Sequence, residues 1–208
     1  MKALIITDIQ NDFCPRGALA VNDGDQIIPV VNNLIPHFNV IVAAQDWHPA
    51  NHGSFAANHP DQQPGNIIDL NGLQQVLWPI HCVQGSHGAE YVATLNTDQI
   101  ERVFQKGQDP SIDSYSGFFD NGRRNSTGMG EYLKEKGVTE TYIVGLATDY
   151  CVKYTALDSH DIGFSTTVIE DACRGVEQNP GDIERALEEM RGKGINVIQS
   201  HELLNTGL

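Results

Sequence analysis

Short apolar runs recur along the chain and predict the buried strands of a parallel sheet. The first, Ala3–Ile9, reads ALIITDI and carries its acid near the carboxyl end. A strand covered by helices on both faces is apolar at nearly every position, whereas a strand with one solvated face alternates apolar and polar residues. Similar runs complete a sheet of about six strands, at Val40–Ala44, Arg102–Gln105, Thr141–Gly145, Thr166–Ile169 and Asn196–Ile198.

Segments with helical periodicity lie between these runs. In Gln26–His37, apolar side chains recur three or four positions apart and therefore share one face. The other predicted helices are Gly128–Lys136, Asp182–Arg191 and the residues that follow Cys151. This alternation of strand and helix predicts an α/β fold, a three-layer αβα sandwich with a mostly parallel, Rossmann-like sheet and ligands at the carboxyl ends of its strands. We expect residues 1–208 to form a single domain.

Two polar segments interrupt the alternation. Pro49–Leu73 is rich in Asn, His, Gln, Pro and Gly, and Gly107–Thr127 is rich in Asp, Ser, Gly and Asn. Both are predicted as long loops. Loops of this length are uncommon in compact domains and usually contribute to a binding or catalytic site.

The charge and the cysteines narrow the functional class. The chain has 27 acidic and 13 basic residues, for a formal net charge of -14, and it would repel nucleic acid and anionic membranes. The four cysteines form no C-x-x-C pair, no apolar run approaches transmembrane length, and the N-terminus lacks a secretory cleavage site, so we expect a cytoplasmic protein. A homodimer would fit the prevalence of twofold oligomers.

Asp46 and His48 follow the second predicted strand and suggest a metal site. In an extended chain, residues two positions apart point to the same side, which suits two ligands of one ion. His81 can add a third ligand from another loop, leaving coordination positions open for water or substrate. His52 is the best candidate for a fourth. The other histidines either lie in loops near the proposed site (His59, His87) or are interpreted as surface or hydrogen-bonded residues (His37, His160, His201).

Cys151 follows a predicted strand and lies near the start of a helical pattern. Free backbone N–H groups and the helix dipole at such a position lower the pKa of a thiol and can bind an oxyanion. Asp8 and Lys106, at the carboxyl ends of two other strands, can supply a base and a positive charge. The alternative is a buried structural cysteine, and we adopt it for the three that do not follow a strand and open a helix: Cys14, Cys82 and Cys173.

Six motifs occur in a recognisable order along nearly the whole chain. They are DIQNDF at Asp8–Phe13, QDWHPANHGSF from Gln45, WPIHCVQG from Trp78, Lys106-Gly107, YSGF at Tyr115–Phe118 and GLATDYCV from Gly145. In this order they resemble the nicotinamidases (pyrazinamidases) of the isochorismatase-like cysteine hydrolase superfamily. The DWH and WPxHC motifs favour nicotinamidases over other members, because they carry the metal ligands in that family.

The resemblance implies a role for each matching residue. Asp8 would be the general base, Lys106 its charge-stabilising partner and Cys151 the nucleophile. A cis peptide would precede Ala147, and the N–H groups of Ala147 and Cys151 would form the oxyanion hole. Aromatic side chains would enclose the pyridine ring of the substrate: Phe13, Trp78 and Tyr115.

The resemblance also implies a cofactor and a reaction. Asp46, His48 and His81 would bind one divalent ion, Zn, Fe or Mn, which orients the pyridine nitrogen. Some members have a further histidine farther along the loop than His52 lies here. The implied enzyme hydrolyses nicotinamide, and also pyrazinamide, through a Cys151 thioester, and for nicotinamide this yields nicotinate and ammonia in pyridine nucleotide biosynthesis (NAD salvage).

Three alternatives stay open from the sequence. One is another small-amide or carbamoyl hydrolase of the same superfamily. A more remote one is an isochorismatase that cleaves a vinyl ether, although such enzymes typically lack the nucleophilic cysteine found here at Cys151. The third is a non-catalytic scaffold that senses metals or thiols.

Overall fold

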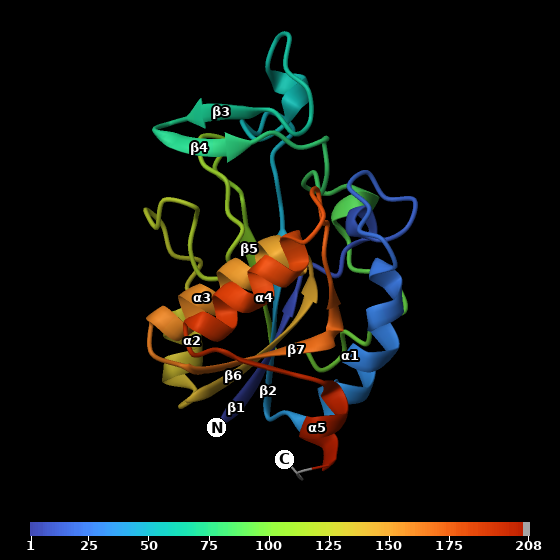
Figure 1. Ribbon diagram of the computed structural model, residues 1–208, viewed down its shortest axis with the longest axis vertical. Coiled ribbons are helices and arrows are strands. Elements are labelled where there is room, and N and C mark those ends of the chain that lie inside the picture. Colours follow the sequence, from blue (N-terminus) through green and yellow to red (C-terminus); the bar gives the residue numbers. More distant parts are fainter. Residues whose placement is uncertain (206–208) are drawn as a thin grey trace.

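A six-stranded sheet forms the centre of the protein (Figure 1). The computed structural model describes residues 1–205, and every neighbouring pair of strands in this sheet is parallel, in the order β5-β2-β1-β6-β7-β8. The fold class predicted from the apolar runs is therefore confirmed, and each run corresponds to one strand. The strands are β1 Lys2–Thr7, β2 Val40–Asp46, β5 Arg102–Lys106, β6 Glu140–Leu146, β7 Ser165–Arg174 and β8 Asn196–Ile198.

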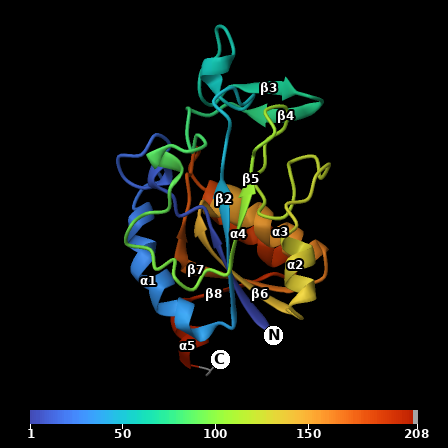
Figure 2. The same ribbon diagram turned by 180° about the vertical axis from the view of Figure 1, so that it is seen from behind.

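Helices cover both faces of the sheet (Figures 1 and 2). Successive strand residues point to opposite faces, so Leu4 and Ile6 of β1 pack in one core while Ala3 and Ile5 pack in the other. The first core is closed by α1 Ile28–Leu34 and α5 Ser200–Asn205, and the second by α2 Met129–Glu135, α3 Lys153–Asp161 and α4 Asp182–Gly192.

No helix within residues 1–205 is long and apolar enough to cross a membrane.

Several element boundaries differ from the prediction, and β7 continues to Arg174, past the predicted end at Ile169. The predicted helix Gln26–His37 is divided: its α-helical part is α1, and 3-10 turns precede and follow it. Pro36 has no N–H to donate, and its ring clashes with an earlier carbonyl, so the α-helix does not continue through it. β1 ends at Thr7 rather than Ile9, because Asp8 adopts a left-handed conformation with φ 50° and turns the chain.

A hairpin begins in one predicted loop. β3 Ile67–Leu70 lies within Pro49–Leu73 and runs antiparallel to β4 Leu73–Val76, which starts at the last residue of that loop, and the hairpin extends beyond the carboxyl ends of the main sheet (Figure 1). The turn is Asn71-Gly72, with φ of 54° and 85°, and Asn-Gly is a strong hairpin signal that sequence reasoning missed. The other predicted loop, Gly107–Thr127, contains no helix and no strand of either sheet in the described chain.

The strand order places a crevice beside β1. From β1 the sheet grows in one direction through β2 and β5 and in the other through β6, β7 and β8. In open parallel sheets, ligands bind outside the carboxyl ends of the strands where the order reverses. Here that point lies between β1 and β6, where Asp8 and Cys151 follow their strands.

Candidate active site

The charged groups of the site meet at the end of Lys106. This side chain is fully buried, and its Nζ lies 2.9 Å from Asp8 Oδ2 and also contacts Asp46 Oδ1. It donates to Ser114 O at 3.0 Å and to Cys151 Sγ at 3.6 Å. Parallel pairing of β1, β2 and β5 brings these strand ends together, as predicted for Asp8, Lys106 and Cys151.

Burial and the shared ammonium set the protonation of this group. Burial raises the pKa of Asp8 to about 6, although Lys106 acts to lower it. Burial disfavours the charged form of Lys106, but Asp46 and Asp8 outweigh it and raise the pKa of Lys106 well above its ordinary value. Lys106 is therefore a fixed positive charge, and Asp8 is ionised at neutral pH.

The pKa of the Cys151 thiol differs from the expectation. The position of Cys151 after a strand suggested a lowered pKa, but burial raises the pKa of this thiol well above its ordinary value, and Lys106 only partly opposes it. Asp8 and Asp46 act in the same direction as burial. Desolvation outweighs the helix terminus, so Cys151 rests as a neutral thiol and must lose its proton to a neighbour before it reacts.

A tight turn holds Cys151 over the sheet. The peptide bond between Leu146 and Ala147 is cis, as the resemblance implied. A π-helical turn, Thr148–Val152, precedes α3, and the N–H groups of Tyr150 and Val152 both donate to Ala147 O. Ala147 and Cys151 line the same pocket.

Asp46, His48 and His81 form the cluster predicted for a metal. His48 Nε2 lies 3.5 Å from Asp46 Oδ2, and His81 Nε2 lies 3.7 Å from the same oxygen. Ligand atoms about 2 Å from a shared tetrahedral ion lie roughly 3.3 Å apart, so this spacing fits an ion between them. All three side chains are buried, although they come from β2 and two separate loops.

The two histidines have their rings fixed by backbone carbonyls. His48 Nδ1 lies 2.8 Å from Gly107 O, and His81 Nδ1 lies 2.8 Å from Pro79 O. A carbonyl oxygen can only accept, so each Nδ1 carries a proton, and each Nε2 faces Asp46, the orientation that metal-binding histidines usually have. Burial acts to raise the pKa of Asp46, but Lys106 and His48 outweigh it and bring it well below the ordinary value, so this carboxylate stays ionised.

His52 and Asp113 lie next to this cluster. His52 is buried, its Nδ1 is 2.7 Å from Ser54 Oγ, and its Nε2 has no hydrogen-bond partner among the described residues. A carboxylate oxygen of Asp113 and ring nitrogens of His48 and His52 lie within 4.8 Å of one another. His59 and His87 lie elsewhere, bonded to Gly53 O and Glu90 respectively. Sequence reasoning did not single out Asp113, because one acid in a polar loop carries no local signal.

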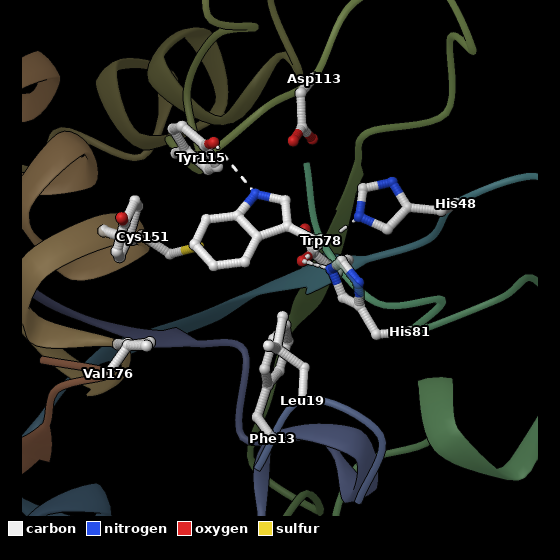
Figure 3. Close-up of a pocket in the computed structure, with 12 residues that line it drawn as sticks. Phe13, Leu19, His48, Trp78, His81, Asp113, Tyr115, Cys151 and Val176 are labelled. Carbon is white, nitrogen blue, oxygen red and sulfur yellow. Dashed lines mark hydrogen bonds and ion pairs between the residues drawn. The ribbon is translucent and has the colours of Figure 1, made fainter. Parts of the chain in front are cut away.

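The pocket above the thiol has largely aromatic and apolar walls (Figure 3). It lies between Cys151 on one side and His48 and His81 on the other. Aromatic and apolar walls with polar groups at two ends suit a small aromatic ring that carries polar atoms. The three aromatic residues expected from the resemblance line it: Phe13, Trp78 and Tyr115. Three further lining residues were missed by the sequence analysis: Leu19, Tyr150 and Val176.

Hydrogen bonds hold the aromatic wall in place. Tyr115 OH accepts from Trp78 Nε1 at 3.1 Å and from Gln75 Nε2 at 3.1 Å. Gln75 also donates to Asp113 Oδ2 at 3.0 Å. Because Gln75 belongs to β4, the unpredicted hairpin supports the pocket and is part of the site.

Comparison with known proteins gives a consistent result. The isochorismatase domain model matches residues 2–202. The nicotinamidase of Escherichia coli (strain K12) is 48% identical over 197 residues, which are 93% of this chain and 92% of that protein.

Solved structures agree with the sequence matches. The Acinetobacter baumanii nicotinamidase pyrazinamidase superimposes with a TM-score of 0.94 at 48% identity, over 97% of each chain. The pyrazinamidase of Pyrococcus horikoshii in complex with zinc superimposes with a TM-score of 0.77 at 41% identity, over 95% of this chain and 98% of that one.

Proposed function

The chain belongs to the isochorismatase family, and from this premise we propose that it is a nicotinamidase, an amidohydrolase that converts nicotinamide to nicotinate and ammonia and also accepts pyrazinamide. Relatives with this activity match nearly its whole length. The roles of the individual residues, and the ion they would hold, are part of this proposal.

One observation carries the proposal at the level of the residues. A neutral thiol and a three-donor cluster face each other across a pocket with aromatic and apolar walls (Figure 3). A pyridine carboxamide has an electrophilic carbonyl at one edge of its ring and a nitrogen donor at another. The geometry therefore suits a substrate whose amide meets Cys151 while its ring nitrogen meets the cluster of Asp46, His48 and His81.

In the first half of the reaction, Asp8 accepts the proton of the Cys151 thiol as sulfur attacks the amide carbon. The negative charge that develops on oxygen is stabilised by the N–H groups of Ala147 and Cys151. Asp8 then gives the proton to the departing nitrogen, ammonia leaves, and the acyl group stays on Cys151 as a thioester.

In the second half, Asp8 takes a proton from water and the resulting hydroxide attacks the thioester carbon. The carbon–sulfur bond breaks, Asp8 returns its proton to Cys151, and the acid product leaves as nicotinate after giving its proton to ammonia or solvent. Lys106 keeps a positive charge beside Asp8 throughout, which offsets the cost of an ionised carboxylate in a buried site.

Asp46, His48 and His81 fit one divalent ion, because they present one carboxylate oxygen and two oriented imidazole nitrogens. Zn, Fe and Mn all accept this donor set. Such an ion would bind the pyridine nitrogen and fix the ring so that the amide carbon lies at the thiol.

Ammonia release tests the function directly. Purified protein should release ammonia from nicotinamide, and benzamide, which has the same shape without the ring nitrogen, should be about a hundredfold poorer in kcat/KM. Equal rates on both amides would contradict the role given to the ring nitrogen. Release from a carbamoyl compound with none from nicotinamide would favour the other small-amide hydrolases, and no release from any amide would favour a non-catalytic scaffold.

A further inference from the structure

β2 extends beyond its neighbour β1 at the site. The register between them ends at Thr7 and Ala44, whereas β2 continues for two residues and pairs Asp46 with Lys106 of β5. On the β1 side the chain has turned away, because Asp8 adopts a left-handed conformation. The backbone of Asp46 therefore has a strand partner on one side only.

The side chain of Gln10 takes the place of the missing strand. Its Oε1 accepts from Asp46 N at 2.9 Å, and its Nε2 donates to Asp46 O at 2.9 Å. The same Nε2 donates to Ala89 O at 2.8 Å. Gln10 is completely buried, so its amide is dedicated to these three bonds and water does not compete for them.

These bonds fix the direction in which Asp46 presents its carboxylate. An N–H and a C=O held on both sides of one Cα set the backbone dihedrals of that residue, and with them the Cα–Cβ direction. The Asp46 carboxylate has to keep a narrow range of positions, because one of its oxygens contacts Lys106 and the other lies 3.5 Å from His48 Nε2. Gln10 N also donates to Asp8 O at 2.8 Å, so one residue ties the proposed base to the proposed ligand.

We propose that Gln10 is a positioning residue that prepares Asp46 to bind the divalent ion. The inference rests on the metal site of the proposed function. It concerns a residue of the DIQNDF motif to which neither the reaction nor the ion assigns a task.

Gln45 offers a matched control. It is also a buried glutamine amide, and its Nε2 donates to the same carbonyl, Ala89 O, at 2.9 Å. Its other side-chain bond is accepted from Gln105, at 3.2 Å. Replacing either glutamine by methionine preserves length and removes a bond to Ala89, but only Gln10→Met removes the two bonds to the backbone of Asp46.

The test measures the zinc affinity of the full chain by competition with a chromogenic chelator. Gln10→Met should bind zinc about 10- to 100-fold more weakly than the unmodified protein, the usual effect of removing a partner that orients a ligand. Gln45→Met should stay within about threefold of the unmodified protein, because Asp46 keeps both backbone bonds in it. Equal zinc affinities of Gln10→Met and Gln45→Met would overturn the proposal.

Cobalt(II) spectra separate positioning from general destabilisation. The visible bands of the cobalt-loaded protein should shift in Gln10→Met and stay unchanged in Gln45→Met, and unshifted bands in Gln10→Met would refute the role. If Gln10→Met does not fold, Gln10→Glu keeps the acceptor for Asp46 N–H and loses the donor, and it is judged by the same two readouts. Neither readout involves nicotinamide, so a protein that binds zinc as described but releases no ammonia would refute the function alone.

Discussion

The thiol side of the pocket, built from Asp8, Lys106 and Cys151, differs from the metal side in how protons are held. On the thiol side, burial raises the pKa of both Asp8 and Cys151, so the proton rests on the sulfur and passes to Asp8 only as the sulfur attacks the substrate. On the metal side, carbonyls at 2.8 Å hold the protons of His48 and His81 on Nδ1. The groups that transfer a proton have their pKa values set by burial, whereas the histidines that would bind an ion have their rings oriented by backbone carbonyls.

Lys106 connects the two sides. Its ammonium contacts a carboxylate on each, Asp8 and Asp46, and lies 3.6 Å from the sulfur of Cys151. Two buried carboxylates depend on this one ammonium, because its removal would leave both of them without a counter-charge. The division of labour can therefore be tested only by substitutions away from Lys106.

The largest expected effect is on the thiol side. Cys151→Ala should lower kcat/KM for nicotinamide by about 10⁴-fold or more, because no other group can form the thioester. Zinc affinity should stay within about threefold, since Cys151 is not among the three donors. Residual turnover near that of the unmodified protein would rule out the covalent mechanism.

A second substitution should affect the metal side of the pocket. His48→Ala should weaken zinc binding by about a hundredfold or more, because it removes a donor outright, and kcat/KM should fall with it. Elemental analysis after dialysis should show depleted metal. Reaction of Cys151 with a small alkylating reagent should proceed as in the unmodified protein, and normal metal content would argue against His48 as a ligand.

The smallest expected effect is the dependence of kcat/KM on pH. Asp8, with a pKa of about 6, must be ionised to accept the thiol proton, so kcat/KM should be level above that pH and fall about tenfold per pH unit below it. The profile should be measured at saturating zinc, so that protonation of His48 does not release the ion. A flat profile down to about pH 4.5 would mean that Asp8 is not the base or is not desolvated.

Local pattern was enough to predict most of the fold. The runs of the central strands β1, β2 and β6 are apolar at nearly every position because both faces of these strands are buried, whereas the edge strands β5 and β8 are partly exposed. The hairpin β3–β4 was missed although its Asn71-Gly72 turn is a local signal, because its strands are largely exposed and too weakly patterned to register as strands. The early end of β1 was missed because nothing in the run ALIITDI indicates that Asp8 turns the chain.

Local motifs were enough to identify the side chains that could take part: the acid after β1, the DWH pair at the end of β2, the lysine ending β5 and the cysteine after β6. The surroundings of these side chains emerged only when the chain was folded. It placed Asp113 beside His52, brought Tyr150 and Val176 into the pocket wall, and set Gln10 against Asp46. It also reversed the expected direction of the pKa of Cys151. Desolvation and contacts across distant segments depend on how the layers close, and no local spacing encodes them.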